Sequence, residues 1–467
     1  MINPPRLHFD RSSKWILNKV AVVCFLLPFG GQVLAVSGEA TVLASPLTET
    51  KAQPFREGEQ VAFVGDSITH SGFYHDYVYL YYATRFPGRK VSFYNCGISG
   101  DTAAGALRRV NGDILRHKPT VATIMLGMND VNRGLYDEGN SALDLPKKRE
   151  AALQSHFDNM RKLVERLSSE QVRLIFMTPS LYDQTTKLER LNSPGVNDAL
   201  VLCGENARKL AAEFKGQVID FNEPMAGINK TLQQADPTAT IIGADRIHPG
   251  EKGHLIMAYL FLKAQNAPQF VADMTIDAKG QTEVQFTEQE KALPFPVSLA
   301  AAPALKLVPF MKELNQERLR VTNLPEASFD LLIDGERVAS FTATELSKGV
   351  NLAELSNTPQ IKQAQDVAKL DAKRHEIAKR LRTIDYVEWK MGREIGDPTD
   401  FDWGAAVEKM NADPKVTGWP KDRVADYSKL KPQQAALLKE HAEAIEAIRN
   451  ESRPKEHHFI VRMTGTK

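Results

Sequence analysis

Short apolar runs alternate with longer amphipathic stretches along the first part of the chain, starting near residue 60. The runs are rich in β-branched and aromatic residues, which predicts buried strands over 61–64, 91–94, 121–126, 172–177 and 218–219. The stretches between and after them have helical spacing, which predicts helices over 74–86, 103–117, 150–168, 199–214 and 254–267. Strands that alternate with helices of this length form a parallel sheet covered on both faces. We therefore predict an α/β unit over residues 60–274.

The pattern changes from about residue 275. Short strand candidates follow over 275–286, 305–310, 319–321 and 329–341, and the last contains an Asp334-Gly335 hairpin turn. Long, highly charged helical patterns then cover 358–391 and 431–450, joined by a connection that contains Trp403 and Trp419. We predict a small β-rich segment over 275–350 and a helical C-terminal region over 351–467. The sequence leaves open whether this tail is separate or wraps the first unit.

The first residues have a different character. Arg6, Arg11 and Lys19 precede an apolar run over 20–29, and small residues follow over 34–37. This order is typical of a secretory signal peptide. The run is shorter than the ~20 residues of a membrane span. We predict a signal peptide over 1–37, a linker over 38–59, an exported protein in the periplasm or outside the cell, and no stable membrane span once the leader is cleaved. The alternative is an uncleaved N-terminal anchor.

Composition narrows the choice of partners. The 467 residues carry a net charge of +1, and the basic residues of the C-terminal third are interleaved with acidic ones. Nucleic-acid binding relies on clustered excess Lys and Arg, so we predict no nucleic-acid partner. Without the leader only Cys96 and Cys203 remain, which permits one disulfide or two free thiols. The oligomeric state stays open.

Polar and glycine-rich blocks follow three of the predicted strands. They are Gly-Asp-Ser at 65–67, Asn-Cys-Gly-Ile-Ser-Gly-Asp-Thr at 95–102 and Leu-Gly-Met-Asn-Asp at 126–130. The carboxyl ends of parallel strands meet at one sheet edge, where functional groups collect. A serine there lies near the positive end of a helix dipole, and the later blocks offer backbone and Asn amide donors. Read alone, each block is more typical of a helix cap or an ordinary turn than of a catalytic site.

A fourth block, Asp-Arg-Ile-His at 245–248, precedes the last predicted helix of the unit. This spacing lets Asp245 bind one imidazole nitrogen of His248 while the other faces outward. Such an arrangement fixes the tautomer and stabilises the imidazolium that forms when a serine gives up its proton. Read singly, His248 is a surface histidine. No Cys or carboxylate cluster completes a metal shell around His248 and His254, so we predict no metal.

Together the four blocks resemble those of the SGNH, or GDSL-like, hydrolase family, over about residues 60–267. The stretch 95–134 particularly resembles the bacterial thioesterase/lysophospholipase branch of that family. The resemblance implies a three-layer α/β/α, flavodoxin-like SGNH domain that needs no cofactor. It makes Ser67 the nucleophile, His248 the general base and Asp245 its orienting partner. The Ser67 amide, the Gly100 amide and the Asn129 side chain form the oxyanion hole.

Asp66 and Asp130 are predicted to cap or brace the loops of the site.

The resemblance also implies the class of reaction. An exported member with an added C-terminal module resembles the carbohydrate esterases, so we predict a secreted serine esterase that works through an acyl-enzyme and removes O-acetyl groups from carbohydrates. One alternative is a lipid or aryl-ester hydrolase. The other is a non-catalytic carbohydrate-binding or scaffold protein with a degenerate hydrolase unit.

Overall fold

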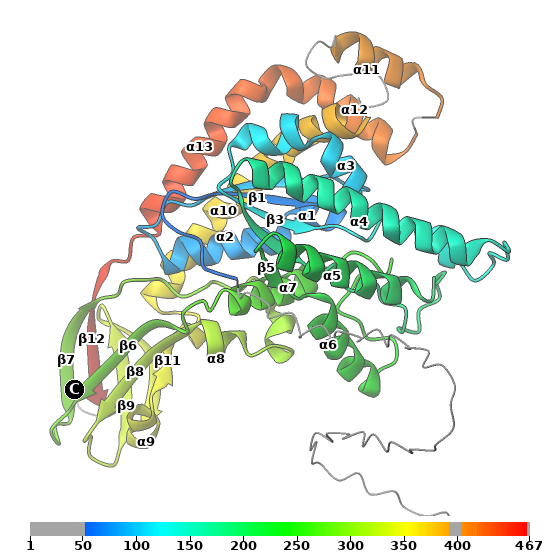
Figure 1. Cartoon of the computed structure of the whole chain (residues 1–467). Helices are drawn as coiled ribbons and strands as arrows, with labels where there is room; N and C mark the ends of the chain where they lie inside the picture. The colour runs from blue at the N-terminus through cyan, green and yellow to red at the C-terminus, as the bar shows by residue number, and fades with distance from the viewer. Residues whose placement is uncertain (1–51, 392–402, 416, 465–467) are drawn as a thin grey trace, which may run out of the picture. The chain divides into compact units, whose positions relative to one another are not determined.

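A parallel five-stranded sheet in the order β2-β1-β3-β4-β5 organises the first part of the computed structural model (Figure 1). The structure describes residues 52–391, 403–415 and 417–464, so the predicted signal peptide lies outside the described residues. The strands are β1 (Gln60–Gly65), β2 (Ser92–Gly97), β3 (Val121–Met125), β4 (Arg173–Met177) and β5 (Gln217–Ile219). The helices are α1 (Ser67–Ser71), α2 (Phe73–Arg85), α3 (Ala103–Arg108), α4 (Leu145–Ser169), α5 (Val196–Glu213), α6 (Asn222–Ala235) and α7 (Glu251–Ala264).

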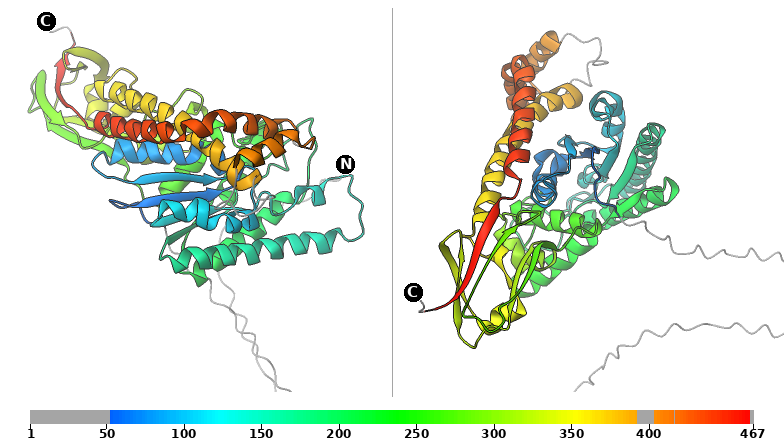
Figure 2. Two further views of the ribbon diagram at one scale, coloured as in Figure 1. Left: turned by 90° about the horizontal axis from the view of Figure 1, so that it is seen from above. Right: turned by 90° about the vertical axis from the view of Figure 1, so that its left-hand side faces the viewer.

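Strand β1 shows how the sheet is buried on both faces. Its side chains alternate, so that Val61 and Phe63 join one apolar core while Ala62 and Val64 join another. Helices α2 and α7 pack on the first core, and α3 and α4 pack on the second. Figure 2 shows the sheet between these helical layers. The predicted three-layer α/β/α fold is confirmed.

A β-rich lobe follows, built from two smaller sheets. One has the order β10-β9-β12-β7 and the other β11-β8-β6. Their strands are β6 (Phe270–Asp277), β7 (Glu283–Gln289), β8 (Gln316–Thr322), β9 (Ser328–Ile333), β10 (Glu336–Thr342), β11 (Val350–Asn351) and β12 (Glu456–Met463). The predicted hairpin turn joins β9 to β10, with Asp334 and Gly335 both at positive φ, as a two-residue type I′ turn requires.

Two features of this lobe differ from the prediction. Residues 305–310 do not form a strand, because Pro303 begins a short helical turn (Ala302–Lys306) and Pro309 precedes α8 (Phe310–Leu314). The predicted helical C-terminal region also contains a strand, since β12 returns to pair between β7 and β9. The buried Phe459 of β12 stacks on Phe286 of β7, with ring centroids 4.9 Å apart.

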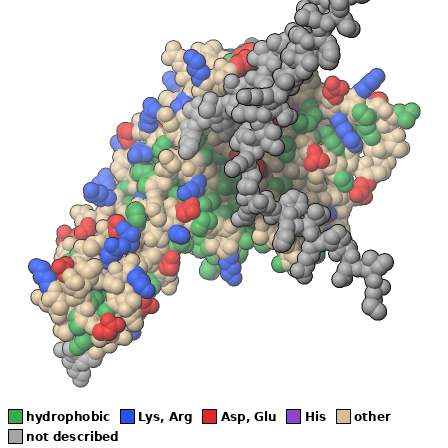
Figure 3. Space-filling model, turned by 60° about the horizontal axis from the view of Figure 1, so that its bottom comes forward, with side chains coloured by type: hydrophobic (Ala, Val, Ile, Leu, Met, Phe, Trp, Pro, Cys, Tyr) green, Lys and Arg blue, Asp and Glu red, His purple; other side chains and the backbone are tan. Residues whose placement is uncertain are grey.

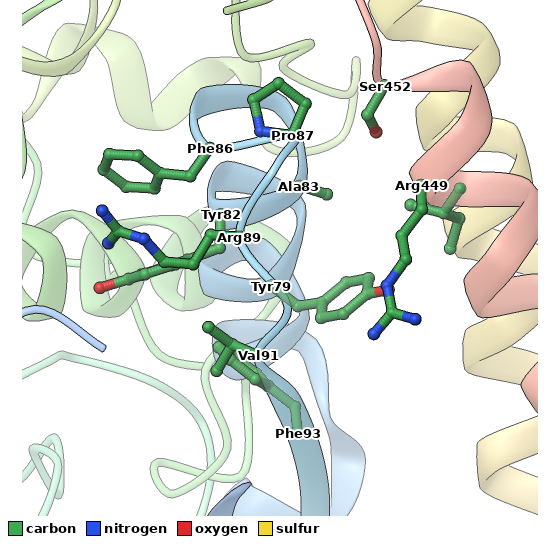
Figure 4. A pocket seen from close by; sticks show the side chains of 11 residues that line it. Tyr79, Tyr82, Ala83, Phe86, Pro87, Arg89, Val91, Phe93, Arg449 and Ser452 are labelled. Carbon is green, nitrogen blue, oxygen red and sulfur yellow. The ribbon is translucent and has the colours of Figure 1, made fainter. Parts of the chain in front are cut away.

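The C-terminal helices pack along the α/β unit of residues 60–274, which is called the catalytic unit below. They are α9 (Ala343–Lys348), α10 (Pro359–Tyr386), α11 (Trp403–Ala412), α12 (Trp419–Leu430) and α13 (Gln434–Glu451). Helix α10 continues as a π-helical turn (Val387–Met391). Figure 2 shows α10 and α13 side by side against α2. Arg374 of α10 donates to Asp76 of α2 over 2.6 Å, and Tyr79 of α2 points toward Arg449 of α13 (Figure 4). The tail therefore wraps the α/β unit, and the described residues belong to one compact unit.

The surface carries charges of both signs. On the described part of the face in Figure 3, Lys and Arg side chains are interspersed with Asp and Glu. Among the described residues, no helix combines the length and apolar character needed to cross a bilayer.

The two cysteines of the catalytic unit are unpaired. Cys96 lies in β2, next to its last residue, and packs in one core, whereas Cys203 lies on α5 in the other core; both are buried. Burial raises the pKa of the Cys96 thiol to about 12. These thiols are therefore protonated packing groups.

Candidate active site

The order of the sheet brings the first three polar blocks to one edge. Strand β1 lies between β2 and β3, and Gly65 is in register with Gly97 on one side and Met125 on the other. Ser67 follows β1 by two residues, and the glycine-rich and Asn-containing blocks leave β2 and β3 at the same level. All three blocks therefore lie at the carboxyl ends of parallel strands, where functional groups collect in such sheets.

Ser67 begins helix α1. Asp66 caps this helix, since its Oδ1 accepts the Ile68 N–H at 3.0 Å. A first helical residue has no acceptor for its own N–H within the helix. Ser67 Oγ lies 2.7 Å from His248 Nε2, and His248 Nδ1 lies 2.5 Å from Asp245 Oδ2. The structure therefore joins these three side chains into one hydrogen-bonded chain across 181 positions of sequence.

The loop that carries His248 is held from both sides. Asp245 Oδ1 accepts the backbone N–H groups of Ile247 and His248, each at 3.0 Å. Burial opposes ionisation of Asp245, but these bonds and the imidazole bond outweigh it and lower the pKa of the carboxyl. The buried Arg246 guanidinium donates to the carbonyls of Asp183 and Thr186, both at 2.9 Å. Asp245 is thus a carboxylate at neutral pH, and Arg246 anchors the loop.

Gly100 and Asn129 lie on adjoining loops. Asp101 N–H closes a turn onto Ile98 O at 3.0 Å, and Gly100 sits in this turn at φ 70°, a conformation that favours glycine. Within the described residues, the Gly100 N–H donates to no protein acceptor. Asn129 Nδ2 donates one hydrogen to Asp101 O at 2.9 Å, which leaves its second hydrogen available.

Asp66 and Asp130 are carboxyls that support the loops. Asp66 caps α1, and Asp130 Oδ1 accepts the Ala103 N–H at 2.9 Å at the start of α3. Burial raises the pKa of Asp66 to about 6 and that of Asp130 to about 7. Near neutral pH both groups are close to their titration points.

A cleft of about 670 Å³ opens over Ser67 and His248. The catalytic unit and the tail both line it. The lining residues are Ser67, His70, Ser71, Ser99 and His248 of the catalytic unit, Glu376, Lys379, Arg380 and Thr383 of α10, and Arg423, Asp426, Lys429 and Leu430 of α12. This lining is dominated by hydroxyl, imidazole and charged groups, with Leu430 as its aliphatic member.

Comparison with known proteins agrees with this geometry. The model of the GDSL-like Lipase/Acylhydrolase family matches residues 63–256. The structure of a gut microbial diltiazem-metabolizing enzyme is 32% identical, with a TM-score of 0.83, over 88% of this chain and 99% of that one. This chain belongs to the GDSL-like lipase/acylhydrolase family.

Two esterases are also similar to this GDSL-like hydrolase. An acetylxylan esterase of Geobacillus stearothermophilus is 28% identical over 44% of this chain and 93% of its own length. An isoamyl acetate-hydrolyzing esterase of Saccharomyces cerevisiae is 28% identical over 38% of this chain and 69% of its own length. Family membership and these relatives make the chain a serine ester hydrolase.

The match to the diltiazem-metabolizing enzyme extends well beyond the hydrolase unit. The family model ends at residue 256, whereas this structural match covers 88% of the chain. The β-rich lobe and tail of this GDSL-like hydrolase therefore have counterparts in a second enzyme of similar architecture.

His70 is a cleft residue that the sequence analysis did not single out. Its Nδ1 accepts the Ser99 N–H at 3.0 Å and lies 2.9 Å from Ser99 Oγ, so the proton of the neutral ring is on Nε2. Burial and the nearby Arg382 lower the pKa of His70 to about 3. His70 therefore ties the helix of the serine to the loop of Gly100, and only the folded structure reveals this link.

No group of three or more His, Cys, Asp or Glu side chains suited to a metal ion occurs within the described ranges.

Proposed function

We propose that this GDSL-like hydrolase removes O-acetyl groups from carbohydrates outside the cytoplasm, with Ser67 as nucleophile. The observation that carries the proposal is the pair of short contacts from Ser67 Oγ to His248 Nε2 (2.7 Å) and from His248 Nδ1 to Asp245 Oδ2 (2.5 Å). An unassisted serine hydroxyl is a weak nucleophile at neutral pH, and a hydrogen-bonded imidazole is the group that activates it.

In the first half-reaction, His248 Nε2 takes the proton of Ser67 Oγ as the oxygen attacks the ester carbonyl. Asp245 accepts the Nδ1–H bond and stabilises the imidazolium that forms. The Ser67 and Gly100 amides and the Asn129 side chain donate to the oxyanion, at about 3 kcal/mol for each donor. His248 then protonates the sugar oxygen, which leaves, and an acetyl group stays on Ser67.

In the second half-reaction, water replaces the sugar. His248 takes a proton from the water as its oxygen attacks the acetyl-serine carbonyl, and the same donors hold the oxyanion. Collapse of this intermediate breaks the Ser67 ester bond, and the proton on His248 returns to Ser67 Oγ. Acetic acid leaves and loses its proton to solvent to become acetate, and the enzyme is restored.

Two observations support a carbohydrate rather than a lipid. The cleft is lined mainly by polar and charged side chains, which bind hydroxyl-rich alcohols better than acyl chains. A similar chain is an acetylxylan esterase. The proposal of export is supported by the basic, apolar and small-residue order of residues 1–37, which is typical of a signal peptide.

Acetate release separates the carbohydrate proposal from its lipid and aryl-ester alternative. The purified enzyme and Ser67→Ala are assayed on acetylated xylo-oligosaccharides and on 4-nitrophenyl esters with acyl chains of two to twelve carbons. We expect wild-type turnover on the acetylated sugar, a steep fall beyond short acyl chains, and loss of nearly all turnover in Ser67→Ala. Faster hydrolysis of long-chain esters together with an inert acetylated sugar would contradict the substrate class, and an active Ser67→Ala would contradict the nucleophile.

A further inference from the structure

The loop that carries Gly100 is held from the tail at three points. The Ile98 side chain is fully buried in an apolar cluster with Ile384 and Val387 of the tail. Arg382 Nε donates to Gly97 O at 2.8 Å, and Lys390 Nζ donates to Gly100 O at 2.5 Å. All three contacts come from one continuous helical segment of the tail. Together they fix Gly97, Ile98 and Gly100, which lie close together along the same loop.

Arg382 is itself immobilised. Its guanidinium is 3% exposed and binds both carboxylate oxygens of Asp113, at 2.7 Å each. Arg109 contacts the same carboxylate and donates to Asp101 Oδ2 at 2.8 Å. Bidentate charge-assisted bonds of this kind are directional as well as strong. The buried cluster thus couples the tail to both ends of the loop.

Lys390 acts at the loop's most adaptable residue. Gly100 has no side chain to restrict its rotation, and its φ of 70° is one of several conformations open to glycine. Its carbonyl is held by Lys390, and the next carbonyl, of Asp101, is held by Asn129. A Cβ built on Gly100 would lie 3.7 Å from Lys390 Nζ, so the ammonium lies directly against this glycine. Two donors therefore fix consecutive peptide groups beside the free Gly100 N–H.

We propose that Lys390 is a positioning residue for the esterase reaction, which rests on the proposed function above. By holding the Gly100 carbonyl, it keeps the Gly100 N–H aimed at the acyl oxygen, and Arg382 fixes the helical segment from which it reaches. Lys390 has no part in proton transfer. The tail is then a component of the oxyanion hole's support rather than an added binding module.

The test compares Lys390→Met, which keeps the aliphatic chain and removes the donor, with Lys390→Arg, which restores one. Lys373→Met, an exposed lysine on the same helix α10, is the matched control. With 4-nitrophenyl acetate we expect Lys390→Met to lower kcat about tenfold and to change KM by less than about twofold. Losses of this size are typical when a residue that holds a reacting group in place is removed. Lys390→Arg should recover most of the rate, Lys373→Met should match wild type, and the thermal midpoints should agree.

Other results would overturn the proposal. A wild-type kcat in Lys390→Met removes the positioning role. A lower kcat that accompanies a fall in thermal midpoint and is not recovered by Lys390→Arg makes the contact purely structural. Ser67→Ala is measured in the same assay: if it is active, the proposed function fails, and if it is inactive while Lys390→Met is unaffected, only the role of Lys390 fails.

Discussion

Arg382 and Asp113 form a bidentate pair, in which Nη1 and Nη2 each donate to a carboxylate oxygen at 2.7 Å across 269 positions of sequence. Both side chains are almost fully buried, at 3% and 0% exposure. Although burial opposes ionisation of Asp113, Arg382 and Arg109 hold the pKa of its carboxyl well below the usual range. This pair joins the tail to the catalytic unit as a charged contact inside the protein.

Asp113→Asn should therefore be strongly destabilising, because it removes the buried carboxylate that Arg382 and Arg109 share. Each guanidinium then keeps one carboxylate partner, Asp385 for Arg382 and Asp101 for Arg109. We expect a loss of about 3 kcal/mol or more in the free energy of unfolding, measured by urea titration. Asp366→Asn provides the control: Asp366 pairs with Lys369 on the exposed face of α10, and its loss should stay within about 0.5 kcal/mol. Equal losses for the two variants would contradict the role given to the buried pair.

Asn129→Ala should damage catalysis more than binding. Its second amide hydrogen is the proposed oxyanion donor, and removal of such a donor costs about a hundredfold or more in kcat. We expect KM for 4-nitrophenyl acetate to change little, since the ground-state carbonyl needs this donor less than the tetrahedral intermediate does. Asn159→Ala, a half-buried site on α4 whose side-chain amide donates to Ser155 O in the same helix, should be unchanged. A kcat near wild type for Asn129→Ala would exclude this side chain from the oxyanion hole.

Acid should destabilise the fold through buried histidines such as His254. Burial lowers the pKa of His254 from 6.5 to about 3, so the folded protein holds this ring neutral while the unfolded chain protonates it. Because His254 is a base with a lower pKa in the folded protein than in the unfolded chain, the neutral ring stabilises the fold fully above pH 6.5. This stabilisation is lost progressively as the pH falls toward 3.

His254→Gln removes that titration. Between pH 6 and pH 4, the free energy of unfolding of the wild type should fall more steeply than that of His254→Gln, by about 1.4 kcal/mol per pH unit. Urea titrations at several pH values measure both slopes. Parallel curves would mean that His254 is protonated in the folded protein as readily as in the unfolded chain.

The catalytic unit could be predicted from sequence because its signals are local. Each strand is a short apolar run, and the first three blocks directly follow β1, β2 and β3. Asp245 and His248 lie three residues apart, so one loop brings their side chains together. Placement of Ser67 opposite His248 needs more than the order of the sheet, since β1 and β5 are not neighbours in it. Helix α7, which follows the His248 loop, packs with α2 on the same core.

The tail could not be predicted in the same way. Arg382 and Lys390 belong to a long helical segment rich in charged residues. Arg382 donates to a carbonyl 285 positions earlier and Lys390 to one 290 positions earlier, but the sequence of the helix does not distinguish them from charged residues that face solvent. Strand β12 depends on partners more than a hundred residues earlier. The false strand at 305–310 has a similar origin, because an apolar run of that length suits a short buried helix equally well.

Active-site labelling tests the central claim most directly. The purified enzyme is treated with a fluorophosphonate, a serine-directed reagent, and the adduct is located by peptide mass spectrometry while residual esterase activity is followed in parallel. The account predicts one adduct, on Ser67, that forms as activity is lost and forms far more slowly in His248→Ala. Complete inactivation with the adduct on another residue, or full activity with Ser67 modified, would contradict it.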